Sequence, residues 1–159
     1  AAQALAQAAG AQLVGTHAGR ARLSAVLVVL LGETDEWAHE RRYDLYLDAV
    51  ARADLFIAQL WQAAQALPGY RGRTTLLVAT DHGRGPGRDW TDHGRDMPVA
   101  GRIWIGLYGP RIAPLGVDSR IMATQSQFAA TIAKAVGEQW QSARVEAATP
   151  IDAAFKTPR

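Results

Sequence analysis

The chain has 159 residues, of which 48% are hydrophobic and 20% are charged, and its formal net charge is +2. This length favours one domain with its own core, and no apolar run approaches the roughly 18 residues that span a membrane. The chain has no cysteine, which excludes disulfides, thiolate metal sites and cysteine nucleophiles. Basic residues are scattered rather than interleaved with aromatic side chains, so we expect no nucleic-acid partner.

The chain begins without an initiator methionine, inside an Ala- and Gln-rich stretch whose apolar spacing predicts a helix over residues 1–14. Both features suggest a fragment or a processed product. We expect residues 15–19 to form a loop. The continuous apolar run at 23–31 predicts a strand that is covered on both faces, and Gly32 ends it.

The strongest periodicity lies in the middle of the chain. Apolar positions recur every 3.6 residues over residues 43–67, which predicts an amphipathic helix, and Pro68 and Gly69 would stop it. The other expected elements are strands at 74–80 and 103–108, a surface loop at 84–98, a helix at 124–136 and a weak tail at 138–159.

This order of elements predicts an α/β fold with a mostly parallel sheet. In such sheets, ligands bind beyond the carboxyl ends of the strands. Asp35 and His39 follow the first predicted strand, and Asp81 and His82 follow the second. We therefore expect two groups of ligand-type residues at one edge of the sheet.

The motif TDEWAH contains Asp35 and His39, four residues apart. On a helical turn, that spacing puts both side chains on one face, where a metal could bridge them. Carboxylate oxygen and imidazole nitrogen are ligands that zinc and related ions use. The alternative is an exposed helix start with no ligand.

Two further motifs carry candidate ligands. Asp81 and His82 precede Gly83, which would permit a tight turn that aims both side chains at one ion, although a solvated turn has the same composition. His93 lies in the predicted loop, where Asp92 is either a partner of its ring or a plain loop residue. Three of the four histidines therefore fall in these motifs.

Several segments, taken in order, resemble the C-terminal half of an alkaline phosphatase superfamily enzyme of the phosphodiesterase (nucleotide pyrophosphatase), sulfatase and metallophosphatase branches. They are TDEWAH, YDLYLDAVARADLFIAQLW, TTLLVATDHGRG, WTDHG, IWIGLYGP and TQSQFAATIAKAVG. The resemblance implies an alkaline phosphatase-like three-layer sandwich with a mostly parallel sheet, incomplete because the N-terminal half is absent. Residues 1–159 would form a single partial domain, with 20–137 as the catalytic core portion and 138–159 as the tail.

The resemblance also implies two divalent metals, zinc first, with manganese, calcium or magnesium as alternatives. Asp35, His39 and His93 would hold one metal. Asp81 and His82 would hold the second, together with an Asp and a Thr or Ser nucleophile from the N-terminal half. No residue here matches that nucleophile, so we expect this chain alone to be inactive.

The implied activity is two-metal-dependent hydrolysis of phosphate mono- or diesters or of sulfate esters. The partners would be a small-molecule ester and the missing N-terminal half. Arg84 and Arg88 could contact the anionic substrate as forked donors, or lie in a solvated loop. Three alternatives stay open: a manganese-dependent phosphomutase of the same superfamily, a phospho-ligand binding domain without a nucleophile, and a plain α/β domain with accidental motifs.

Overall fold

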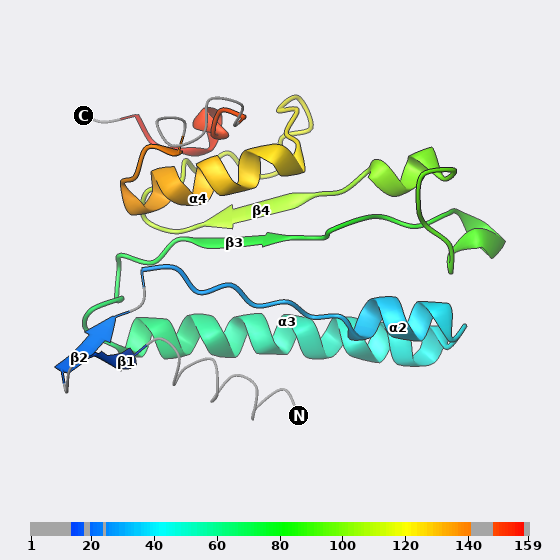
Figure 1. The fold of residues 1–159 in the computed structure, drawn as a ribbon, viewed down its shortest axis with the longest axis horizontal. Helices are drawn as coiled ribbons and strands as arrows, with labels where there is room; N and C mark the ends of the chain where they lie inside the picture. The colour runs from blue at the N-terminus through cyan, green and yellow to red at the C-terminus, as the bar shows by residue number, and fades with distance from the viewer. Residues whose placement is uncertain (1–13, 18–19, 24, 141–147, 158–159) are drawn as a thin grey trace. The chain divides into compact units, whose positions relative to one another are not determined.

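The computed structural model describes residues 14–17, 20–23, 25–140 and 148–157 (Figure 1). The predicted helix at the N-terminus lies outside the described residues, apart from Val14. The chain divides into two compact units. Unit 1 comprises Ala1–Arg71 and Ala79–Ile105, and unit 2 comprises Gly72–Val78 and Gly106–Arg159. Unit 1 therefore contains all five predicted metal ligands.

Two helices dominate unit 1, α2 (Glu33–His39) and α3 (Tyr43–Ala66). The predicted long helix is thus confirmed. Arg52 of α3 binds Glu33 of α2 at 3.0 Å, and Ala38 of α2 is fully buried, so the two helices lie side by side (Figure 1). Among the described helices, none is both long and apolar enough to cross a membrane.

Among the described residues of unit 1, the largest buried side chain is Phe56 on α3. Leu27, Ile57 and Leu60 pack against it. Burying these side chains contributes apolar stabilisation to this unit. Leu27 also fastens the extended stretch before α2 to the long helix.

The junction between α2 and α3 passes through Arg41, whose φ of 58° is the only positive value at a non-glycine position in the described part. The Arg41 N–H donates to Ala38 O and the Arg42 N–H to Trp37 O, both at 2.9 Å. This is the Schellman pattern that ends many helices, and it normally places glycine at the left-handed position. The turn after His39 is therefore sharp and fixed by backbone hydrogen bonds.

An antiparallel hairpin precedes α2. It consists of β1 (Val14–His17) and β2 (Arg20–Leu23), with His17 opposite Arg20. The predicted loop over 15–19 is therefore wrong for residues 15–17, and residues 18–19 lie outside the described part. The sequence lacks the Asn-Gly or Asp-Gly pair that marks the commonest short hairpins, so no turn signal predicts a hairpin here.

The apolar run that was predicted as the first strand of the sheet does not form one. Residues 25–31 are extended but belong to no strand among the described residues, and Leu30 is 90% exposed. An apolar run indicates what a strand could bury, but it does not show that a neighbouring strand is available to pair with its backbone. The prediction of a strand over 23–31 is therefore wrong for residues 25–31.

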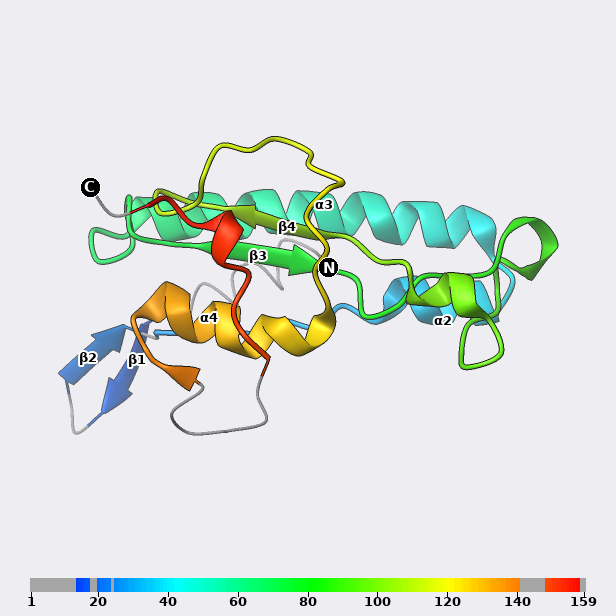
Figure 2. The same cartoon turned by 90° about the horizontal axis from the view of Figure 1, so that it is seen from above.

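Unit 2 contains most of β3 (Leu76–Ala79) and β4 (Ile105–Tyr108), which pair with each other. The two strands run in opposite directions (Figures 1 and 2). A short 3-10 helix, Gln125–Gln127, leads into α4 (Phe128–Val136). A capping box at Thr124 starts this helix and Gly137, with φ 89°, ends it. The predicted strands at 74–80 and 103–108 and the predicted helix at 124–136 are thus confirmed.

The predicted fold class is wrong. The described residues form two separate two-stranded sheets, β1-β2 and β3-β4, rather than a three-layer sandwich around a mostly parallel sheet. Parallel neighbours need a long crossover, usually a helix. Between β3 and β4 the chain forms only short 3-10 turns, Gly87–Asp89 and Pro98–Gly101. The expected first strand is also missing, so no crossover through α3 arises.

Residues 148–157 are part of unit 2 and are joined to it by backbone hydrogen bonds, whereas the sequence predicted a weak tail here. Phe155 forms an isolated antiparallel bridge with Ile112. The Ala113 N–H donates to Ala154 O, and the Lys156 N–H donates to Arg111 O, both at 2.9 Å. These hydrogen bonds fix the backbone on both sides of the Phe155 ring.

Candidate metal centre

The centre forms in unit 1, where α2 faces the loop that follows β3. Asp35 and His39 lie one turn apart on α2, and His39 Nε2 is 3.4 Å from Asp35 Oδ2. The spacing of four residues therefore places both side chains on one face, as predicted from the sequence. The acidic first turn of α2 suits the positive end of the helix dipole.

His82 and His93 approach the same carboxylate from the loop. Each Nε2 lies 3.5 Å from Asp35 Oδ1, and the two rings stack with centroids 3.9 Å apart and planes 15° apart. One ligand atom from each of Asp35, His82 and His93 falls within 4.8 Å of the others. Three residues from three separate motifs therefore converge on one point.

His39 lies against this group. Its Nε2 is 3.1 Å from His93 Nε2, and the ring centroids are 5.1 Å apart. The resemblance implied a first site of Asp35, His39 and His93, whereas the geometry groups Asp35 and His93 with His82. The two groupings share Asp35 and His93 and differ in one histidine.

The tautomer of His82 is fixed by its neighbour. His82 Nδ1 is 2.9 Å from the carbonyl oxygen of Gly83. A carbonyl oxygen can only accept, so Nδ1 carries the hydrogen and the lone pair is on Nε2, the atom that faces Asp35. A backbone carbonyl on the second ring nitrogen is the usual partner of a metal-ligating histidine.

Two glycines let the loop fold tightly around His82. The Gly83 N–H donates to Ala100 O at 2.6 Å, and a Cβ at Gly83 would lie 2.9 Å from Arg102 O. At Gly85, a Cβ would lie 2.5 Å from Asp89 O. Neither glycine has a positive φ. Glycine is needed at both positions because a Cβ would collide with a backbone carbonyl oxygen of another part of the loop. The sequence predicted only that Gly83 permits a tight turn.

Arg84 contacts the centre directly. Its guanidinium pairs with Asp35 Oδ1 and donates a further hydrogen bond to Thr91 O at 3.1 Å. Arg84 therefore neutralises part of the Asp35 charge and ties α2 to the loop that carries His93. Arg88 lies exposed on the turn Gly87–Asp89 and belongs to no contact of the centre that the structure describes.

Asp81 lies at the rim. Its side chain is 88% exposed, and its Oδ2 is 3.7 Å from His82 Nε2 while its Oδ1 accepts the His82 N–H. It is not part of the group of three. Adjacent side chains at a strand end diverge, and here His82 turns towards Asp35 while Asp81 stays in solvent.

An aromatic cluster beside the centre was missed by the sequence reasoning. The Trp90 ring makes edge contacts with Tyr43 and Tyr46, with centroids 5.1 and 5.7 Å apart. It joins the loop that carries His93 to α3. The positions carried a signal, since Trp90 lies three residues before His93 and Tyr43 four residues after His39.

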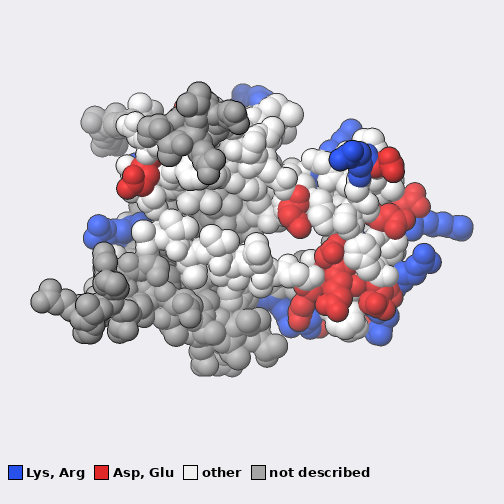
Figure 3. Space-filling view, viewed as in Figure 1, with Lys and Arg blue, Asp and Glu red and all other residues white. Residues whose placement is uncertain are grey.

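The donor set fits a divalent metal. The first turn of α2 carries Glu33, Asp35 and Glu36, and Figure 3 shows acidic side chains in this part of the molecule with Lys and Arg side chains among them. His39 Nε2 and His93 Nε2 lie 3.1 Å apart, the distance of an N–H···N hydrogen bond between rings of complementary tautomer. One carboxylate and two imidazoles leave an open position, the pattern of catalytic zinc.

Comparison with protein-family models, with curated proteins and with solved structures finds no match for this chain. Function is therefore inferred from the chemistry of the centre and from the motifs themselves.

Proposed function

We propose that this chain is the metal-ligand portion of a two-metal-dependent hydrolase that acts on phosphate mono- or diesters or on sulfate esters. The observation that carries the proposal is the convergence of Asp35, His82 and His93 from three separate motifs. The ordered resemblance of these motifs to those of the alkaline phosphatase superfamily supports the same reaction class. Zinc is the metal that best suits the donor set.

The residues of the centre have distinct roles in this proposal. Asp35 supplies an anionic oxygen, and His82 and His93 supply neutral nitrogens, while the Gly83 carbonyl orients the His82 ring. These residues would hold a divalent metal, which would lower the pKa of a coordinated hydroxyl or water and offset the charge of the ester. Arg84 holds Asp35 towards the loop, and its remaining donors suit an anionic ester oxygen.

No residue of this chain is assigned as the nucleophile. Thr34, Thr80 and Thr91 adjoin ligands in the sequence, but none occupies the place of the nucleophile in the motif pattern. Thr91 is also buried, at 7% exposure. We therefore expect the chain to retain about one metal and to show little or no turnover alone.

Metal retention tests the centre. The purified chain is loaded with zinc, desalted exhaustively and analysed for metal, with circular dichroism as the check on folding. We expect about one equivalent, as in a three-ligand site. Asp35→Asn and His93→Ala should lose it. His17→Ala, which removes a histidine outside the three motifs, should keep it. A folded chain without metal, or unchanged metal in both ligand variants, would contradict the proposal.

Turnover tests the missing nucleophile. The zinc-loaded chain is assayed with bis(p-nitrophenyl) phosphate, p-nitrophenyl phosphate and p-nitrophenyl sulfate. We expect no burst and no steady release of p-nitrophenol above the Asp35→Asn control. Sustained release that depends on Asp35 would show that the chain carries its own nucleophile or activates water directly.

A further inference from the structure

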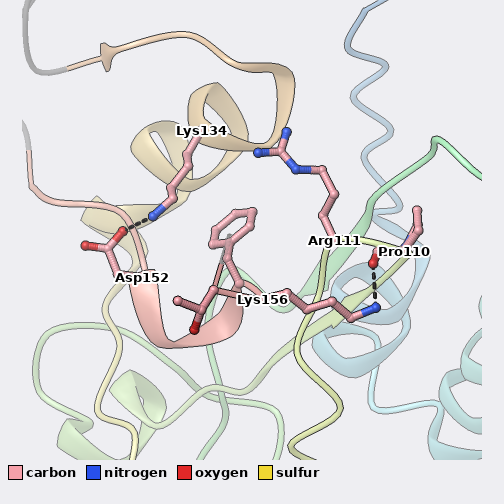
Figure 4. Close-up of a pocket in the computed structure, with 7 residues that line it drawn as sticks. Pro110, Arg111, Lys134, Asp152 and Lys156 are labelled. Atoms are coloured by element: carbon pink, nitrogen blue, oxygen red, sulfur yellow. Dashed lines mark hydrogen bonds and ion pairs between the residues drawn. The ribbon is translucent and has the colours of Figure 1, made fainter. Parts of the chain in front are cut away.

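A second charged site lies in unit 2, in sequence segments that the metal centre does not use. A pocket of about 530 Å³ opens between α4 and the C-terminal residues (Figure 4). Its lining includes Arg111, Lys134, Asp152, Phe155 and Lys156. The volume falls in the range of sites for small organic molecules.

The charges in this pocket do not balance. Lys134 pairs with Asp152. Arg111 donates to Ala135 O at 3.0 Å and Lys156 to Pro110 O at 2.6 Å. A carbonyl oxygen satisfies an N–H group but cancels no charge, and neither Arg111 nor Lys156 has a carboxylate ion-pair partner in the described part of the chain. Two positive charges therefore remain, in a concave site.

The backbone holds these two cations near each other. The Lys156 N–H donates to Arg111 O at 2.9 Å, and the bridge between Ile112 and Phe155 lies beside that hydrogen bond. The two side chains thus extend from segments that are joined through their main chains. Such an arrangement reduces the entropy that a ligand would otherwise have to offset when it orders them.

The pocket also has an apolar side. Phe155 is half-buried and its ring lies under Lys134, with Nζ 5.0 Å from the ring centroid. Pro110 adds a second apolar surface to the lining. An inorganic anion alone would use the cations but leave these surfaces uncovered. The lining therefore suits a ligand with an anionic head and an organic body.

We propose that this pocket binds a small organic phosphomonoester in its dianionic form. Arg111 and Lys156 hold the phosphate oxygens, and Phe155 and Pro110 contact the organic body. A phosphomonoester carries close to two negative charges at neutral pH, which matches the two uncompensated cations. The forked donors of arginine suit phosphate oxygens. If the cations only fasten the C-terminal residues, no such preference exists.

The test compares two probes with the same organic body. Phenyl phosphate and phenyl sulfate are titrated separately into the full chain by calorimetry, with EDTA present so that the metal centre does not contribute. NMR of the Phe155 ring protons reports whether the probe enters the pocket. We expect phenyl phosphate to bind and to shift these protons. Phenyl sulfate carries one charge, so its affinity should be at least about tenfold lower.

Variants locate the charges. Arg111→Gln and Lys156→Gln should each weaken phenyl phosphate binding about tenfold, because each removes a charge-assisted hydrogen bond. Arg111→Lys keeps the charge without the fork and should give a smaller loss. Arg120→Gln is the matched control, since Arg120 lies in the same unit, is paired with Asp118 and is outside the lining. Its affinity should stay within about twofold.

Three results would overturn the proposal: a folded chain that does not bind phenyl phosphate, equal affinity for the two probes, or unchanged affinity in both glutamine variants. If a glutamine variant unfolds, the comparison of the two probes on the unmodified chain, read at Phe155, still decides. Loss of metal binding in the Asp35 variants does not affect this result, because the titration is free of metal.

Discussion

The two charged sites of this protein are built in opposite ways. The centre in unit 1 gathers a carboxylate and imidazole nitrogens and contains one cation, Arg84, which pairs with Asp35. The pocket in unit 2 gathers cations and contains one carboxylate, Asp152, which pairs with Lys134. Each site thus satisfies part of its charge internally. The charge and lone pairs that remain determine whether a cation or an anion fits.

The largest expected effect comes from Asp35, which contacts three histidines and Arg84. Asp35→Asn removes the anionic oxygen that both ligand groupings share, so we expect zinc affinity to fall at least about 100-fold, more than for an outer partner. A competition titration against a chromophoric chelator measures this. Arg111→Gln is the contrasting control from the other site and should change zinc affinity by less than about twofold.

The same titration separates the two groupings. His82→Ala should weaken zinc binding more than His39→Ala, because His82 belongs to the group whose ligand atoms lie within 4.8 Å of one another. The reverse order would favour the set that the resemblance implies. Equal and negligible losses would argue that neither histidine binds the metal.

The next largest effect is a loss of stability at Trp90, whose ring links the loop of the metal centre to α3. Trp90→Ala removes two edge contacts with tyrosine rings, and we expect the free energy of unfolding to fall by about 1–3 kcal/mol. Urea denaturation measures it. Trp104→Ala is the matched control, because Trp104 is 57% exposed and lies outside the cluster. A larger loss at Trp104 would contradict this role of Trp90.

A smaller change in stability is expected at the residues that end α2 and α4, and its sign should differ between the two helices. Unit 1 ends α2 with Arg41 at a φ of 58°, whereas unit 2 ends α4 with Gly137 at 89°. Arg41→Gly should therefore stabilise the protein by about 1 kcal/mol, and Gly137→Ala should destabilise it by a similar amount. Thermal denaturation of both variants tests the pair. A destabilised Arg41→Gly would mean that the arginine side chain contributes more than its backbone costs.

The smallest effect is a pH dependence in unit 2. Hydrogen bonds from the Arg120 side chain and backbone lower the pKa of the Asp118 carboxyl. A lowered folded-state pKa contributes stability that is complete above the ordinary value of about 3.9 and is lost as the pH falls through the folded value. Asp118→Asn should flatten this acid limb of the stability curve. An unchanged acid limb would show that the pair makes no measurable contribution to the free energy of unfolding, as is found for many surface ion pairs.

Local patterns predicted four of the elements, α3, α4, β3 and β4. The helices α3 and α4 follow from a 3.6-residue period, and β3 and β4 follow from apolar runs that turn residues bound. These features depend on neighbours in the sequence. Strand pairing depends on segments far apart, and no pattern in the sequence reports directly which strands pair. The parallel sheet was inferred from the alternation of elements, and it failed at residues 25–31, where no partner strand is present among the described residues.

The candidate site shows the same division. The placement of Asp35 and His39 on one helical face was a local inference, and α2 has that geometry. The approach of His82 to Asp35 was expected at the edge of a parallel sheet, and that of His93 only from the resemblance, but in the structure both arise from α2 facing a loop. The roles of Arg84 and Trp90 depend on which side chains the loop brings within reach, so the sequence left Arg84 between two interpretations and missed Trp90.

The extended run at residues 25–31 has a consequence for the behaviour of the protein in solution. It reads AVLVVLL, without charge, proline or glycine, and Val28 is 69% exposed. A backbone of this kind is a template for pairing with another copy, the first step towards cross-β fibrils. Concentrated solutions should therefore age into thioflavin-positive aggregates. Val28→Lys, which introduces a gatekeeper charge, should lengthen the lag time without changing the metal centre.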